Sequence, residues 1–220
     1  MFVVTAARTW TLSDGTAHPT GYWAEELLIP HRLLTEAGHT VAFATPGGVA
    51  PVADEASLGD EAEEIRSALV AIAGLSDPLR LEDVDLSTYD AVFYPGGHGP
   101  MEDLSRDAAS GALISQALNA DLPLALVCHG LAALLAATGE DGAAAAAGRR
   151  VAAFTDAEEI QAGLADRAPW LLESTLRERG IVVEAADPWS DHVVVDGNLV
   201  TGQNPQSSGS VARTLLERLA

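Results

Sequence analysis

The sequence predicts an α/β protein: a three-layer α/β/α sandwich with a mainly parallel central sheet. Short apolar runs typical of buried strands alternate along the chain with segments of helical periodicity. Turns rich in glycine and proline close several of the apolar runs, and most connections are short. Alternating strands and helices favour parallel pairing with helices on both faces of the sheet. A chain of 220 residues fits a single domain, residues 1–220.

The first half of the chain begins with an apolar strand and a polar connection. Apolar residues then recur at helical spacing over residues 23–37, where Pro30 should kink the helix and Gly38 should end it. The expected elements, in order, are a strand at 2–6, a long loop at 9–21, a helix at 23–37, a strand at 39–44, a helix at 61–73 and a strand at 90–94.

The second half continues the alternation and ends in a predicted hairpin. The turn of this hairpin is Asp196-Gly197-Asn198, a sequence typical of tight β-turns. The expected elements are helices at 107–119, 130–137, 169–179 and 207–220, and strands at 122–127, 151–154, 181–184, 193–195 and 199–201.

The composition argues against nucleic-acid and membrane-surface partners. Thirty-two acidic residues against twelve Lys and Arg give a formal charge of −20, which repels phosphate backbones and anionic headgroups. The sequence shows neither a leader pattern nor an apolar window long enough to span a membrane, so a cytoplasmic protein is expected. The single cysteine cannot form an intrachain disulfide, and a reducing compartment would keep it a thiol.

That cysteine, Cys128, lies where an apolar strand at 122–127 turns sharply into a helix. This is the layout of a nucleophile elbow, in which a strained turn lifts the side chain out of the carboxyl edge of the sheet. The following helix N-terminus is expected to lower the thiol pKa and favour the reactive thiolate. A lone cysteine in an apolar segment is commonly just a small buried side chain. Neighbouring His129 and Gly130 favour the catalytic interpretation.

A glycine-rich turn at 96–99 follows another predicted strand. Its backbone N–H groups could point into the same crevice, because ligands of open α/β sheets bind beyond the carboxyl ends of the strands. The N–H of Gly97 and the N–H that follows Cys128 would then form an oxyanion hole, although such a run can equally be only a turn. Neither a Walker nor a dinucleotide-binding motif occurs.

Glu26 belongs to the start of the first helix and therefore to the same edge of the sheet. Desolvation by Trp23 and Leu27 would raise its pKa and let it exchange protons with a thiol or substrate. The alternative is that Glu25 and Glu26 simply stabilise the helix N-terminus.

Seven segments of the chain, in order, resemble the ThiJ/PfpI superfamily. They are GYWAEELLIP, ATPGG with PVADEASL after it, YDAVFYPGGHGPMEDL, LPLALVCHGLAALL, AAFTDAEE, PWLLESTLRERG and DGNLVTGQNPQSS. The resemblance implies a flavodoxin-like fold shared with class I glutamine amidotransferases. It is closest to the branch of glutathione-independent glyoxalases (glyoxalase III) and related heat-shock chaperones.

The resemblance also implies the catalytic residues. Cys128 would be the nucleophile, His129 its partner and Glu26 the carboxyl group beside the sulfur. The third member of the triad would be an acid of the segment after the next strand, and the candidates are Asp156, Glu158 and Glu159, with Glu159 favoured.

Four further residues would bind the substrate. Gly97 would supply an oxyanion N–H, and His98 and Trp23 would lie at the pocket. Asn204, with Pro205, would line the far side of the crevice.

Related enzymes convert methylglyoxal to D-lactate without a cofactor, so a small carbonyl substrate and a homodimer are expected. The superfamily also contains amidases, peptidases, holdase chaperones and oxidation sensors, and these alternatives remain open because fold does not determine function. One member binds a metal with two His and a Glu, for which His18, His31 and Glu26 could be considered. Their spacing is not diagnostic, and no metal is expected.

Overall fold

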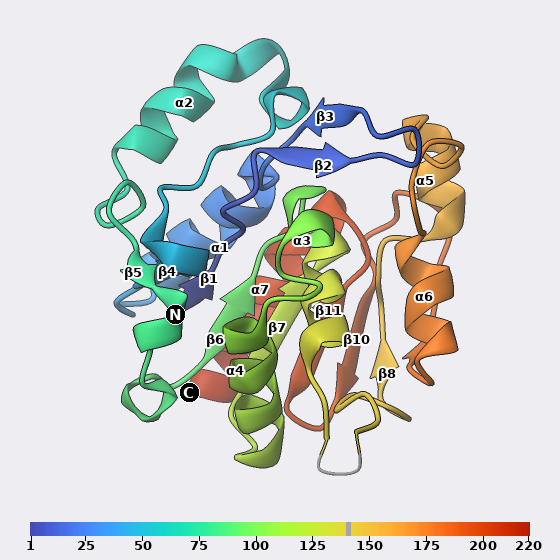
Figure 1. The fold of residues 1–220 in the computed structure, drawn as a ribbon. Helices are drawn as coiled ribbons and strands as arrows, with labels where there is room; N and C mark the ends of the chain where they lie inside the picture. The colour runs from blue at the N-terminus through green and yellow to red at the C-terminus, as the bar shows by residue number, and fades with distance from the viewer. Residues whose placement is uncertain (140–141) are drawn as a thin grey trace.

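The computed structural model describes residues 1–139 and 142–220, and its centre is a mainly parallel sheet (Figure 1). Within the described residues the sheet has seven strands in the order β10-β11-β7-β6-β1-β4-β5. Their bounds are β1 Phe2–Val3, β4 Phe43–Thr45, β5 Leu79–Arg80, β6 Val92–Tyr94, β7 Leu124–Val127, β10 Val193–Asp196 and β11 Leu199–Gly202. Among these seven strands only β10 pairs antiparallel, in the predicted hairpin with β11.

The central strands are apolar along their whole length because helices cover both faces of the sheet. All residues of β6, β7 and β11 are buried, the pattern expected of parallel strands inside an α/β protein. Tyr94 pairs with Leu126, and Gly202 pairs with Val127. The segments that follow these three parallel strands therefore leave the sheet at the same end, the carboxyl ends of the strands. They bring together residues that are distant in sequence.

Helices form the two outer layers, as the sequence predicted (Figure 1). On one face, α1 (Ala24–Glu36) packs against α7 (Ser208–Leu219), and α1 also contacts α2 (Ala62–Val70). On the other face, α4 (Ala108–Asn119) packs against the segment that follows β7. The α/β/α sandwich is thus confirmed.

One prediction about strands was wrong, and two further predicted strands are present but shorter than expected. Residues 9–21 do not form only a loop, because β2 (Thr9–Thr11) and β3 (Ala17–Pro19) pair as a hairpin near the carboxyl edge of the main sheet (Figure 1). The hairpin is polar and largely exposed except for Trp10, so it lacks the apolar run of a buried strand. The strands predicted near 151–154 and 181–184 are β8 (Arg150–Val151) and β9 (Val182–Val183), which pair with each other in a separate small sheet.

Several helices also differ from the prediction. The segment after β7 is a 3₁₀ helix, η6 (Cys128–Ala136), not an α-helix. Two short helices were not predicted, namely α3 (Gly99–Glu102) and α5 (Asp156–Ala162), and α6 (Leu172–Glu178) is shorter than expected. A capping box explains where α5 starts: Thr155 accepts from the N–H of Glu158, whose carboxylate accepts from the N–H of Thr155.

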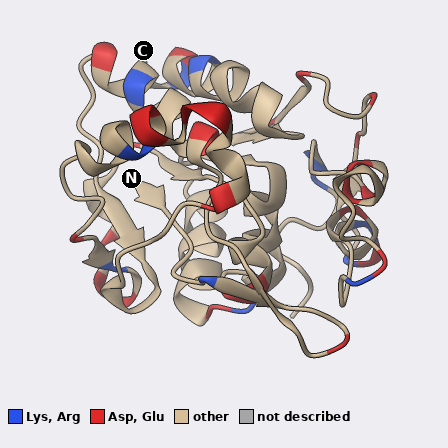
Figure 2. Cartoon of the chain, turned by 90° about the horizontal axis from the view of Figure 1, so that it is seen from above, with Lys and Arg blue, Asp and Glu red and all other residues tan. Residues whose placement is uncertain are grey.

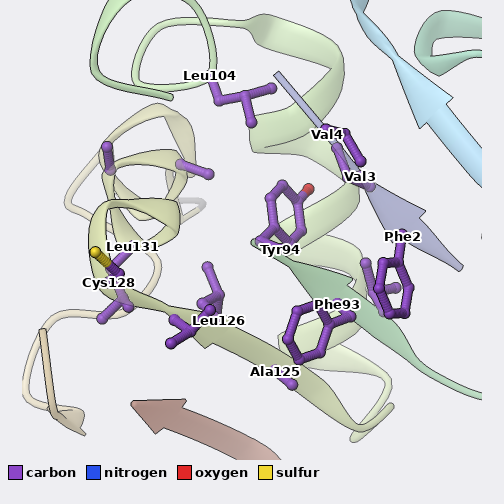
Figure 3. Packing of buried hydrophobic residues seen from close by; sticks show 14 of the residues in the cluster. Phe2, Val3, Val4, Phe93, Tyr94, Leu104, Ala125, Leu126, Cys128 and Leu131 are labelled. Carbon is purple, nitrogen blue, oxygen red and sulfur yellow. The ribbon is translucent and has the colours of Figure 1, made fainter. Parts of the chain in front are cut away.

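The main apolar core lies along the sheet and reaches the end of β7 (Figure 3). The rings of Phe2 and Phe93 stack at 4.7 Å, and Phe43 meets Phe2 edge-on at 5.6 Å. Cys128 stands at the margin of this cluster, just past β7, with its sulfur beyond the packed side chains of the strands (Figure 3). The core therefore fixes the position of the thiol.

Acidic residues lie on helices and loops around the periphery, with few basic residues between them (Figure 2). No helix within residues 1–139 and 142–220 is long and apolar enough to cross a membrane.

Candidate active site

Cys128 occupies a strained turn at the end of β7. Its φ is +56°, in the left-handed region that side-chain-bearing residues rarely adopt. The turn is tight because Gly130 passes so close to β6 that a Cβ there would lie 2.6 Å from the carbonyl oxygen of Tyr94. The thiol is 4% exposed. The strand β7, the strained residue Cys128 and the helical turn after it together form the geometry of a nucleophile elbow.

His129 links the thiol to a buried carboxylate. Its Nδ1 lies 3.3 Å from the sulfur of Cys128, and its Nε2 lies 2.7 Å from Oε2 of Glu159. An ionised carboxylate only accepts hydrogen bonds, so Nε2 carries the proton. In the neutral imidazole Nδ1 is then unprotonated and can accept the thiol proton.

The structure separates the three acids that the sequence left open. Glu159 contacts His129, whereas Asp156 accepts a hydrogen bond from the hydroxyl of Ser174 outside this cluster. Glu158 is buried but turns away from the imidazoles, and its oxygens accept from Thr155, from the N–H of Trp189 and from two side-chain amides. The first turn of α5 thus holds three acids with three different sets of partners.

The charges of the His129–Glu159 pair are set by its surroundings. Burial and then the charge of His98 lower the pKa of His129, and Glu159 only partly opposes them. His129 is therefore neutral at neutral pH and able to act as a base. Burial works to raise the pKa of Glu159, but the charge and hydrogen bond of His129, followed by those of His98, outweigh burial and hold that pKa well below its usual range.

Glu26 approaches the thiol from α1. It is completely buried, and its Oε2 accepts a hydrogen bond of 2.6 Å from the N–H of Gly96. Its Oε1 is buried without a hydrogen-bond partner among the described residues. Burial raises the pKa of Glu26 to about 8, although its interactions with Cys128 and Gly96 favour the ionised form. The sequence analysis expected a raised pKa at Glu26 from desolvation, and burial is the largest cause of the shift.

The expected low pKa of the thiol is contradicted. Burial, followed by the charge that Glu26 carries once it is ionised, raises the pKa of Cys128 well above its ordinary value, while the N–H groups of His129 and Gly97 oppose this shift. The expectation failed because it counted the turn but not the loss of solvent around the sulfur. The resting thiol is protonated, so the nucleophile must form by proton transfer during the reaction.

Two glycines allow the loop after β6 to approach the elbow. A Cβ at Gly96 would lie 2.7 Å from the backbone nitrogen of His129 and 2.8 Å from Oε2 of Glu26. Gly97 has φ of +88°, and a Cβ there would lie 2.6 Å from the nitrogen of Trp23. This close packing places the N–H groups of Gly97 and His129 against the sulfur, where an oxyanion hole was predicted.

The two remaining predicted pocket residues have supporting contacts. The backbone N–H of Trp23 donates to the carbonyl of Gly96 at 3.0 Å and so holds the glycine loop. The Asn204 side chain is buried and donates to Oε1 of Glu158 and to the carbonyl of Ser190, both at 2.8 Å. Asn204 thus lies behind α5 and is not bonded to the imidazole pair.

A row of aromatic rings crosses the site, and the sequence analysis missed it. The indole of Trp10 stacks on His98 at 5.1 Å, and His98 lies 4.2 Å from the ring of His129. Beyond His129 follow Phe154 at 4.3 Å and then Trp189, whose φ is +63°. A buried tryptophan in an otherwise polar loop was the one available signal, since a large apolar side chain there needs a partner.

His98, His129 and Glu159 could also hold a metal ion, since their ligand atoms all lie within 4.8 Å of one another. However, the two N···O distances of 2.7 and 2.9 Å are hydrogen-bond lengths, and both carboxylate oxygens are already occupied. An ion would have to spread this cluster and displace two protons. His18 and His31 are not part of it: His18 lies in β3, and His31 stacks on Phe43.

The model of the DJ-1/PfpI family matches residues 19–218. The chain belongs to the DJ-1/PfpI family. A glutamine amidotransferase-like class 1 domain-containing protein 1 from Bos taurus is 30% identical over 141 residues, which are 64% of this chain and 64% of that protein. A protein/nucleic acid deglycase HchA from Staphylococcus aureus is 28% identical over an alignment that covers 100% of this chain and 79% of that protein.

Solved structures agree with this family. The rapid encystment protein from Francisella tularensis has a TM-score of 0.89 and 26% identity, with 100% of this chain and 97% of that chain covered. A structure titled glyoxalase III from Candida albicans has a TM-score of 0.81 at 23% identity, with 98% and 95% covered, and shows that the fold is shared.

Proposed function

We propose that this chain is a cysteine-dependent, cofactor-free enzyme that converts methylglyoxal or a related small 2-oxoaldehyde to the 2-hydroxy acid. The observation that carries the proposal is a thiol with a proton acceptor on one neighbouring side chain and a proton donor on another. His129 offers an unprotonated nitrogen 3.3 Å from the sulfur, and Glu26 offers a carboxyl group with a pKa of about 8. The glyoxalase III from Candida albicans, which shares the fold, carries a name that agrees with this chemistry.

The reaction requires two proton transfers at adjacent carbons and no net redox change. The thiol gives its proton to Nδ1 of His129, and the sulfur adds to the aldehyde carbon to form a hemithioacetal. The proton on that carbon is then removed, the neighbouring carbonyl oxygen is protonated, and an enediol forms. Return of a proton to the second carbon gives a thioester, which water hydrolyses to the 2-hydroxy acid and the free thiol.

The protonation states of the site suit this sequence. Neutral His129 can receive the thiol proton, and ionised Glu159 stabilises the imidazolium that results. Glu26 can give or take a proton near neutral pH, which a carboxyl group of ordinary pKa could not do. The N–H groups of Gly97 and His129 would stabilise negative charge on the carbonyl oxygen during addition.

The limited exposure of the thiol favours a small substrate. Cys128 is 4% exposed, and Glu26, His129 and Glu159 are buried. A groove of about 690 Å³ lies elsewhere, between α1 and α2, where residues such as Leu28 and Ala71 line it. A three-carbon oxoaldehyde is therefore a more suitable substrate to test than a folded protein.

The test is incubation of the purified chain with methylglyoxal in the absence of glutathione, with lactate and its stereochemistry measured. We expect D-lactate from the wild type and none from Cys128→Ser, whose hydroxyl is a much weaker nucleophile than a thiol. If the wild type forms no lactate at high enzyme concentration, this substrate is excluded. Holdase activity, measured in parallel, should survive Cys128→Ser if the chain is a chaperone.

A deglycase-type reaction is the second candidate, favoured by the similarity to HchA, which extends over 100% of this chain and 79% of that protein. Nucleic acid is a poor substrate for a chain of net charge −20, so a glycated amino acid or peptide is the appropriate probe. Release of the free amine at a rate exceeding spontaneous hydrolysis, and its loss in Cys128→Ser, would favour this reaction.

A further inference from the structure

Glu159 binds two imidazoles, and the mechanism proposed above uses only one of them. Nε2 of His98 lies 2.9 Å from Oε1, while Nε2 of His129 lies 2.7 Å from Oε2. Because the ionised carboxylate only accepts, both imidazoles donate from Nε2. One side chain on each oxygen fixes the plane of the carboxylate as well as its position.

His98 is itself held from several sides. Its ring stacks on Trp10 with an interplanar angle of 14°, and it lies tilted against His129 on another side. Its backbone lies between Gly97 and the start of α3, where the glycine loop packs against α1. Both His98 and Trp10 are buried. The imidazole therefore has little freedom to turn its Nε2 toward a substrate.

The same contact affects the basicity of His129. After burial, the proximity of His98 is the largest influence that lowers the pKa of His129, and Glu159 acts in the opposite direction. By binding Glu159, His98 also shares the negative charge that would otherwise act on His129 alone. His98 thus influences both the orientation of His129 and its readiness to give up a proton.

We propose that His98 is a positioning residue for His129: it holds one oxygen of Glu159 so that the other fixes His129 with Nδ1 facing the sulfur. This role differs from direct substrate binding, which the family resemblance implied for His98. It deepens the proposed function, on which its catalytic readout rests. The relevant contact is with Glu159, so the role predicts an effect on thiol chemistry even without the natural substrate.

Two substitutions of His98 test the Nε2–H donor and the aromatic ring separately. His98→Phe keeps an aromatic ring against Trp10 but cannot donate to Glu159, whereas His98→Gln loses the ring but carries an N–H at the level of Nε2. His98→Met fills similar volume without a donor and replaces His98→Phe if that variant does not fold. His39→Gln, in a loop at the opposite edge of the sheet, is the matched control.

The first measurement is the rate at which iodoacetamide alkylates Cys128, followed from about pH 5 to about pH 9. The chain has one cysteine, so mass spectrometry reports this reaction without ambiguity. We expect His98→Phe to slow alkylation near neutral pH by about tenfold to a hundredfold and to change its pH profile, the range seen when a supporting partner of a functional side chain is lost. His98→Gln should recover most of the rate, and His39→Gln should match the wild type.

The second measurement is kcat and KM with methylglyoxal. A positioning role predicts that His98→Phe lowers kcat by a similar factor and changes KM by less than about threefold. An increase in KM alone, or alkylation equal to that of the wild type in a folded donor-free variant, would overturn the proposal. If the wild type makes no lactate but the alkylation rates differ as expected, the substrate assignment fails and the role of His98 stands.

Discussion

Two glutamates approach the Cys128–His129 pair from different helices, and their environments shift their pKa values in opposite directions. Glu26 arrives from α1, and its Oε1 has no hydrogen-bond partner among the described residues. Glu159 arrives from α5, and both of its oxygens accept from imidazoles. Both side chains are almost inaccessible to solvent, yet the pKa of Glu26 is raised to about 8 and that of Glu159 is held below its usual range.

The difference shows that the partners of a buried carboxyl group, and not its burial alone, decide whether it keeps a proton. Desolvation opposes ionisation at both positions, but only Glu159 has two imidazole N–H groups to compensate it. The α1 side of the site therefore carries a proton to exchange, and the α5 side carries a fixed negative charge. This asymmetry is the arrangement that an acid–base reaction at a thiol requires.

The largest expected effect is that of Glu159→Gln. The amide offers one acceptor oxygen where the carboxylate offered two, so one imidazole would face an N–H group and His129 would lose the charge that stabilises its protonated form. We expect kcat with the active substrate to fall by about a thousandfold to ten-thousandfold, the scale seen when the acid of a catalytic triad is neutralised.

Steady-state kinetics with circular dichroism as a folding control would check this expectation. A folded Glu159→Gln variant with kcat within tenfold of the wild type would show that the negative charge of the α5 side is dispensable.

Glu26→Gln is expected to lower kcat by about a hundredfold to a thousandfold, because it removes the exchangeable proton and keeps the volume. The loss should persist across the pH range, since the amide cannot titrate. The pH–rate profile of the wild type should show a group near pH 8 that is missing in the variant. Equal profiles would mean that Glu26 does not transfer the proton, and its protonated state would then be only a consequence of burial.

The two carboxyl groups should also change the free energy of unfolding with pH in opposite directions. Folded Glu26 keeps its proton up to about pH 8, whereas the unfolded chain releases it near its ordinary value of 4.5. Stability therefore falls as pH rises between these values, by at most about 5 kcal/mol. Glu159 has a lowered pKa, so its contribution is present above its ordinary value of 4.5 and is lost as pH falls below it.

Chemical denaturation of the wild type, Glu26→Gln and Glu159→Gln at a series of pH values would measure these slopes. Glu26→Gln should flatten the decline between about pH 5 and about pH 8, and Glu159→Gln should flatten the loss in acid. If neither slope changes, the two carboxyl groups have similar protonation in the folded and unfolded chain, and the comparison between the two sides fails.

The smallest effect is expected for Asp156→Asn. Asp156 binds Ser174 and lies outside the imidazole cluster, so kcat should change by less than about threefold, with a stability loss of about 1 kcal/mol or less. Measured beside Glu159→Gln, this variant tests which of the two acids serves His129. A loss of activity as large as that of Glu159→Gln would contradict the assignment.

Sequence patterns predicted the structure best where the same residues determine both the local backbone and the candidate site. The apolar run before Cys128 and the glycines around it predicted both a buried strand and a tight turn, and the structure contains both. The glycine loop at 96–99 could be predicted for the same reason, because close backbone approach excludes side chains.

Side-chain environments were less predictable. The thiol pKa was expected to be low because the local turn was visible in the sequence, but the loss of solvent around the sulfur, which is the largest influence on this pKa, has no local signal. Trp10 was assigned to a loop, because a polar hairpin with one buried residue has no periodic signal. Among Asp156, Glu158 and Glu159, one turn of sequence could not show which side chain faces His129.

The sequence by itself determined the layered α/β architecture and the elbow at Cys128. The alternation of strands and helices along the chain, the apolar runs and the glycines are all local features of the sequence. Only the tertiary structure decided which acid meets His129, that His98 shares it, and which carboxyl group holds a proton. These properties depend on desolvation and on hydrogen bonds between residues up to 70 positions apart, and no local pattern records them.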